Sequence, residues 1–245
     1  MNTLLIGIIL IYHVIFAVID CKDIRKYKDM LITEKVRVNY YKEIVLASWI
    51  PVCIILMFII FTTLSYSEIG LRNIQFSNII WLNVVTVIVH GVLILVLLIQ
   101  SVQCITNKEY QMQVQKSFNK ENNKAYDSML HVLIPRTKRE KKWWFLVSVS
   151  AGVCEEIVWR GTLMFLLQQI FPSIGFVSAS IISCILFGFM HSYQGIYGVI
   201  KTGLVSISFI LLLFVTGSII PGIFVHFLLD YSSAFLISDT PPVLS

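Results

Sequence analysis

Charged side chains are scarce in this sequence. Only 13% of its 245 residues are Asp, Glu, Lys or Arg, whereas 57% are hydrophobic, and the mean hydropathy is +0.80. A soluble domain typically carries about 25% charged and about 45–50% apolar residues. The composition therefore excludes an ordinary soluble domain and indicates an integral membrane protein.

Several familiar signatures are also missing. The spacing of the five cysteines matches neither a CxxC pair nor a disulfide framework. We therefore expect the cysteines to serve as small buried side chains. The sequence contains no P-loop, glycine-rich phosphate fingerprint or internal repeat. Its first 20 residues lack a basic n-region and a small-x-small cleavage site, which favours a retained first span over a signal peptide.

Long apolar runs fill most of the chain. A transmembrane helix needs about 20 mostly apolar residues, and the sequence predicts about seven such spans, within a range of six to eight. They cover approximately residues 3–19, 44–64, 79–103, 143–170, 175–193, 196–216 and 218–237. The predicted fold class is an all-α, polytopic transmembrane helical bundle.

Basic residues gather in two predicted loops. Lys and Arg occur seven times in residues 20–43 and nine times in residues 104–142, but the loop 65–78 has only Arg72. The positive-inside rule places both basic loops in the cytoplasm and the N-terminus outside. With seven spans, the C-terminus is then inside. Because the positive charge follows the loops, we expect a lipid bilayer and no nucleic acid as partner.

The segment "AGVCEEIVWRG" carries three charges inside an apolar run. Each charge costs about 2.5–3.5 kcal/mol near the centre of a span, so these groups must face the bundle interior or a wet cavity. Glu156 and Arg160 are four residues apart and can pair on one helical face. Glu155 is rotated by about 100° from Glu156, which leaves it free for chemistry.

Two later spans also carry ionisable residues. "FGFMH" contains His191, and "HFLLD" contains His226 and Asp230 four residues apart. Intramembrane ionisable groups are candidates for function. Their depths, counted along each helix, place these residues and Glu155 in the cytoplasmic half. We therefore expect one polar cavity that opens to the cytoplasm.

This set of groups suits peptide hydrolysis. Glu and His can deprotonate a water, and a second His with Asp can stabilise an oxyanion. Two His and a carboxylate also fit a zinc site, although HExxH is absent. Both mechanisms remain open at this point.

The motifs "EEIVWR", "FGFMH" and "HFLLD" resemble EExxxR, FxxxH and HxxxN/D of the CPBP intramembrane proteases, the CAAX protease and bacteriocin-processing (Abi) family. They occur in the family's order, on separate apolar segments. The resemblance covers roughly residues 130–235. It predicts N-terminal helices and cytoplasmic loops over 1–129 and a catalytic core domain over 130–245.

The resemblance also implies roles for individual residues. Glu155 and His191 would activate water, and His226 and Asp230 would stabilise the oxyanion or bind a metal. Structural support of the site would come from Glu156, Arg160 and Phe187. A divalent metal such as zinc, if present, would be held by His191, His226 and Glu155. Asp230 stands where the prenyl-protein processing enzymes have Asn, and an ionised Asp cannot donate to an oxyanion.

We therefore predict an intramembrane endopeptidase, or metalloendopeptidase, of the CAAX prenyl protease 2-like type. Its substrate would be a peptide precursor or a membrane-protein tail. The resemblance favours a multi-pass protein of a bacterial cytoplasmic membrane. The alternative is a non-catalytic immunity or regulatory protein of the same family, and a proton-coupled transporter lacks the expected repeated halves. The cleavage site, the pathway and the oligomeric state are not predicted.

Overall fold

The computed structural model describes residues 2–28, 33–124 and 133–236, and these residues form helices joined by irregular segments, the longest of which covers residues 62–79. The α-helices are α1 (Asn2–Lys28), α2 (Glu34–Phe61), α3 (Ile80–Thr106), α4 (Lys108–Lys124), α6 (Lys138–Glu155), α7 (Met164–Ile170), α8 (Phe176–Met190), α9 (Gly195–Thr216) and α10 (Ile220–Ser232). A π-helix, η1 (Glu156–Leu163), joins α6 to α7, and η2 (Ser192–Gln194) and η3 (Ser233–Phe235) are short 3₁₀ turns. The predicted all-α class is confirmed.

Helices occupy each of the predicted spans. Within the described ranges, four helical segments are long and apolar enough to cross a membrane: Thr3–Lys22, Glu34–Phe61, Ile80–Thr106 and Ser192–Thr216. Two shorter apolar helices, Phe176–Met190 and Ile220–Phe235, fill the fifth and seventh predicted spans. The charged fourth span is a continuous helical path through α6, η1 and α7. The predicted transmembrane bundle is confirmed, while its C-terminal tail lies outside the described residues.

The first basic loop is shorter than predicted. The apolar pattern placed a loop over residues 20–43, but α1 continues to Lys28 and α2 already begins at Glu34. Thr33 caps α2, because its side-chain oxygen accepts a hydrogen bond from the Val36 N–H at 3.4 Å. Tyr41 and other side chains of this first part of α2 are buried. The apolar pattern did not predict this first part of α2, because polar and charged residues interrupt its apolar face.

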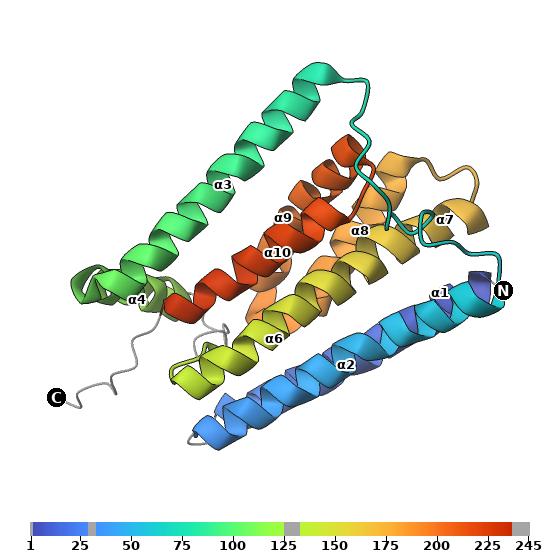
Figure 1. The fold of residues 1–245 in the computed structure, drawn as a ribbon. Helices are drawn as coiled ribbons and strands as arrows, with labels where there is room; N and C mark the ends of the chain where they lie inside the picture. Colours follow the sequence, from blue (N-terminus) through green and yellow to red (C-terminus); the bar gives the residue numbers. More distant parts are fainter. Residues whose placement is uncertain (1, 29–32, 125–132, 237–245) are drawn as a thin grey trace.

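Helices α6, α8, α9 and α10 form the centre of the molecule (Figure 1). The hairpin of α1 and α2 packs on one side, with α2 against α6, and α3 packs on the other side against α10 and α9. The end of α1, the starts of α2 and α6 and the end of α10 all lie at one end of the bundle (Figure 1). The two basic segments therefore share one end, and its cytoplasmic orientation stays a prediction.

Small residues let the central helices approach closely. A Cβ added to Gly152 of α6 would lie 3.0 Å from the carbonyl oxygen of Ile223 and 3.1 Å from the amide nitrogen of Phe227, both in α10. Between membrane helices, such glycines allow backbones to pack in direct contact. This contact places α10 against the C-terminal half of α6, where the acidic pair lies.

A buried ion pair joins α2 to the start of α6. Thr137 and Glu140 form a reciprocal capping box, and Arg37 Nε donates a 2.9 Å hydrogen bond to Glu140 Oε1. The side chains are only 7% and 0% exposed. Arg37, which we counted among the basic residues of a cytoplasmic loop, is therefore a packing residue of α2.

Replacing Arg37 tests this junction. Arg37→Met leaves the Glu140 charge buried without its guanidinium, and breaking a buried pair from one side costs about 3–5 kcal/mol. We expect a clearly lower free energy of unfolding for the protein in mild detergent. The matched control is Arg139→Met, because Arg139 Nη1 lies 3.6 Å from Glu34 Oε1 in an exposed pair. The control should cost less than about 1 kcal/mol; equal losses in both variants would contradict the assignment.

Candidate active site

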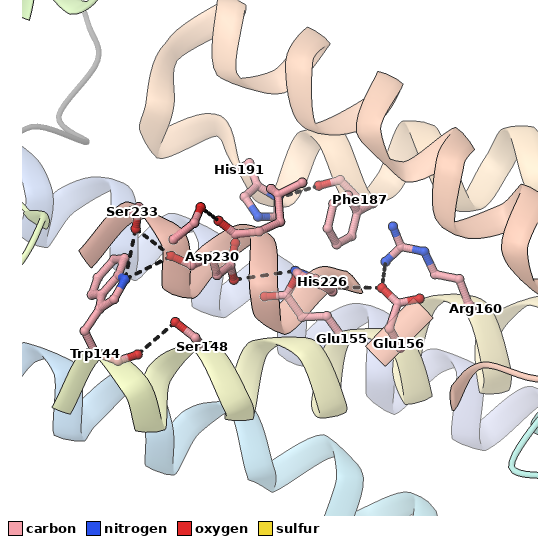
Figure 2. A network of polar contacts seen from close by, with 12 residues as sticks. Trp144, Ser148, Glu155, Glu156, Arg160, Phe187, His191, His226, Asp230 and Ser233 are labelled. Atoms are coloured by element: carbon pink, nitrogen blue, oxygen red, sulfur yellow. Dashed lines mark hydrogen bonds and ion pairs between the residues drawn. The ribbon is translucent and has the colours of Figure 1, made fainter. Parts of the chain in front are cut away.

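His226 of α10 lies at the centre of a cluster of carboxylates (Figure 2). Its Nδ1 is 2.9 Å from Oε1 of Glu156. Its Nε2 is 3.6 Å from Oδ2 of Asp230 and 3.8 Å from Oε2 of Glu155. One buried imidazole thus joins the end of α6, the start of η1 and the next turn of α10. The polar residues predicted to converge do so around this ring, although the cavity itself stays a prediction.

Glu156 and Arg160 form the predicted ion pair, with Arg160 Nη1 3.1 Å from Glu156 Oε1. Both side chains are almost completely buried, at 1% and 0% exposure. Arg160 Nη2 also donates a 2.9 Å hydrogen bond to the Ser206 hydroxyl, and the guanidinium lies 4.1 Å from the ring centre of Phe187. The Glu156 carboxylate is therefore held from two sides, by Arg160 and by His226.

The backbone around this pair is a π-helix, which we did not predict. The sequence indicated one α-helix over residues 143–170, but η1 replaces it from Glu156 to Leu163. π-Helical turns use i→i+5 hydrogen bonds, are rare and occur frequently at functional sites. Gly161 lies in this turn, and a Cβ there would collide with the carbonyl group of Ile69. No sequence pattern that we considered distinguishes such a turn from an α-helix.

Two residues of α9 complete the surroundings of the cluster and were missed. Phe209 stacks on His226, with 4.9 Å between the ring centres and 15° between the planes. Ser206 binds Arg160 as described above. Neither belongs to any of the three motifs. The sequence marks Ser206 only as a small polar residue in an apolar helix. Ser208 has the same character but contacts His90 instead, so this feature does not identify the residue that binds Arg160.

His191 ends α8 and lies beside the cluster (Figure 2). Its Nδ1 is 2.9 Å from the carbonyl oxygen of Phe187. A carbonyl oxygen only accepts, so Nδ1 carries the hydrogen and the neutral ring keeps Nε2 as an acceptor. His191 also interacts electrostatically with Asp230 and His226. The depth of His191 in the membrane stays a prediction.

Glu155 differs from its neighbour Glu156 in having no hydrogen-bond donor. Its Oε2 atom is buried and accepts no hydrogen bond within the described part of the chain. The 3.8 Å to His226 Nε2 exceeds hydrogen-bond length, as does the 3.6 Å from Nε2 to Asp230. Polar contacts of this length suit a bridging water. No ion pair or hydrogen bond joins Glu155 directly to His191 in the described ranges.

Glu155, His191 and His226, named above as the ligands of a metal if one is present, are not arranged as a metal site. Among the described residues, no group of three or more His, Cys, Asp or Glu side chains is placed to hold a metal ion. His226 uses Nδ1 for Glu156 and faces two carboxylates with Nε2. A zinc site needs at least three donors that point to one position, so the set Glu155, His191 and His226 does not fit one.

Comparison with protein families agrees with the motifs. Residues 139–232 match the family model described as type II CAAX prenyl endopeptidase Rce1-like. This segment belongs to the CAAX protease (CPBP) family. It contains the three motifs and falls within the predicted core domain, 130–245. No curated protein and no solved structure matches the chain. The CAAX protease domain and the apolar helices together indicate an intramembrane protease of the CAAX type.

Identical substitutions at the two adjacent acids should separate their roles. Glu156→Gln leaves Arg160 buried without its counter-charge, so we expect a loss of about 3–5 kcal/mol in the free energy of unfolding. Glu155→Gln removes a charge that has no hydrogen-bond donor and should leave stability unchanged or raise it. Thermal unfolding in detergent measures both. Equal destabilisation would show that Glu155, like Glu156, stabilises the fold.

Proposed function

We propose that the protein is an intramembrane endopeptidase that hydrolyses a peptide bond in a peptide precursor or a membrane-protein tail. The observation that carries this proposal is the contrast between two adjacent acids. Glu156 is tied to Arg160 and His226, whereas Oε2 of Glu155 is buried without a donor. Burial without compensation is costly, and a carboxylate that acts as a base needs an oxygen free to accept a proton.

Glu155 is the general base in the proposed reaction. Its Oε2 accepts a proton from a water molecule, and the water oxygen attacks the carbonyl carbon of the scissile peptide. His191 lies beside the cluster with Nε2 as an acceptor and helps to orient this water. When the tetrahedral intermediate collapses, the C–N bond breaks and the proton on Glu155 passes to the amine product. Protons balance without any further group.

His226 stabilises the oxyanion in this proposal. Its Nδ1–H is directed to Glu156, and its ring is fixed by stacking on Phe209. With Nε2 also protonated, the ring donates from that nitrogen towards the space beside Glu155. Asp230, 3.6 Å from Nε2, favours this charged form. As an ionised acid it orients His226 rather than donating to the oxyanion itself.

The substrate would reach the site from the end of the bundle that carries the basic segments. His191 caps the end of α8 there, and Asp230 lies two residues before the end of α10. This placement supports a peptide whose cleavable bond lies near one face of the membrane. Peptide precursors and membrane-protein tails have this geometry. A non-catalytic immunity or regulatory protein would need no acid left without a donor.

Purified protein should cleave peptides in a Glu155-dependent manner. We would offer, in proteoliposomes, a panel of internally quenched peptides with apolar C-terminal ends. The panel would include a CAAX peptide with and without a farnesyl group. Cleavage at a defined bond, identified by mass spectrometry, should fall at least about 10²-fold in Glu155→Gln and in His191→Ala. Tyr197→Phe, on an exposed side chain, should retain full activity.

The same assay distinguishes the non-catalytic alternative. A well-folded wild-type protein that cleaves none of the panel would contradict the proposal. Equal turnover by wild type, Glu155→Gln and His191→Ala would do the same, because the cleavage would then come from a contaminant.

Chelators should not inhibit the cleavage. The proposed chemistry uses Glu155 as the base and draws no step from a metal. We expect unchanged turnover after dialysis against EDTA and in the presence of 1,10-phenanthroline, with a zinc endopeptidase as a positive control. Inhibition that added zinc reverses would overturn the glutamate mechanism while leaving the endopeptidase activity intact.

A further inference from the structure

Oxyanion holes work through several preorganised hydrogen-bond donors, and the motif residues of this site supply few. Arg160 keeps two buried donors, Nε and Nη1, without a hydrogen-bond partner among the described residues. Its guanidinium, however, lies beside Glu156 and Ser206, at the opposite end of the cluster from Asp230 (Figure 2). The indole N–H of Trp144 is shared by the Asp230 carbonyl and the Ser233 hydroxyl (Figure 2). His226 contributes one N–H at Nε2 in the proposed mechanism. A second donor beside His226 can therefore be sought outside the three motifs.

Tyr193 lies next to the site and has a hydrogen to donate. It is two residues after His191, and their ring centres are 5.9 Å apart. Its hydroxyl oxygen accepts a 2.9 Å hydrogen bond from Gln194 Nε2. Within the described part of the chain, that hydroxyl donates its own hydrogen to no protein oxygen. Tyr193 interacts electrostatically with three acids: with Asp20 most strongly, and then with Glu155 and Asp230 of the site.

The surroundings of Tyr193 hold its ring in place. The ring packs with a cluster formed by α2 and α6, whose buried members include Tyr41 and Val147. Behind it, Tyr40 donates a hydrogen bond to Asp20, and Cys21 Sγ lies 3.3 Å from the Ser192 hydroxyl. Tyr193 is therefore fixed between α1, α2 and the end of α8. A rigid donor of this kind needs little reorganisation during a reaction.

We infer that the Tyr193 hydroxyl is the second oxyanion donor, with Gln194 orienting it. The inference rests on the proposed endopeptidase function. As the tetrahedral intermediate forms, the carbonyl oxygen of the substrate becomes negative and accepts hydrogen bonds from His226 Nε2 and from Tyr193. The hydroxyl remains neutral and transfers no proton. Asp230 then needs no proton of its own to serve in this site.

Tyr193→Phe tests the inference because it keeps the ring and removes only the hydroxyl. Loss of one oxyanion donor typically lowers kcat by about 10²–10³-fold. We expect kcat and kcat/KM to fall together by about 10²-fold while KM stays unchanged, because the bond strengthens only in the transition state. The reporter is the peptide of the panel that the wild-type protein cleaves fastest. Tyr197→Phe, which removes an exposed hydroxyl from the same segment, is the matched control.

Gln194→Ala provides a second measurement if Tyr193→Phe unfolds. It keeps the phenol but removes the hydrogen bond that orients it, so kcat should fall several-fold with unchanged KM. If Tyr193→Phe folds and its activity is within twofold of wild type, the inference is overturned. If Tyr193→Phe does not fold, activity of Gln194→Ala within twofold of wild type overturns it. A rise in KM with unchanged kcat, which is typical of ground-state binding, also overturns it.

The failure of this inference and of the proposed function are distinguishable. If Glu155→Gln is inactive while Tyr193→Phe is fully active, the endopeptidase function stands and Tyr193 has no part in it. If wild-type protein gives no Glu155-dependent cleavage of any peptide in the panel, the proposed function itself fails and the role of Tyr193 fails with it.

Discussion

The carboxylate of Glu156 is the contact on which the centre of this molecule depends. It forms an ion pair with Arg160 in its own helical turn and accepts a hydrogen bond from His226 in α10. Without it, the buried guanidinium of Arg160 would lack its counter-charge, at a cost of several kcal/mol, and the buried ring of His226 would lose its hydrogen-bond partner at Nδ1. The same carboxylate fixes which nitrogen of His226 faces Glu155 and Asp230. Stability of the bundle and orientation of the site therefore share one set of bonds.

Packing of small residues makes this contact possible. Gly152 lets α10 lie directly on α6, and Gly222 faces the Glu156 carboxylate, where a Cβ would lie 3.1 Å from Oε2. The π-helical turn then presents Glu156 and Arg160 to α10 and α9. In a membrane, where apolar side chains gain little by leaving lipid, such close packing and buried polar contacts are the main forces between helices.

Much of this arrangement was predictable. Apolar runs located the membrane helices, because a span requires about 20 apolar residues. The cost of charge in lipid singled out Glu155, Glu156, Arg160, His191 and His226, and helical spacing paired Glu156 with Arg160. The buried start of α2 was missed, since its inward face is short and carries Arg37. Ser206 and Phe209 were missed because they belong to no motif.

The sequence by itself determined which groups had to be buried together, because polar side chains in apolar helices must find one another. Tertiary structure alone decided how they share their bonds. In the folded protein, Nδ1 of His226 binds Glu156, Oε2 of Glu155 has no hydrogen-bond donor, and Tyr193 lies beside His191. These outcomes depend on helix contacts and on a local π-turn. Residue spacing along one helix carries no information about either.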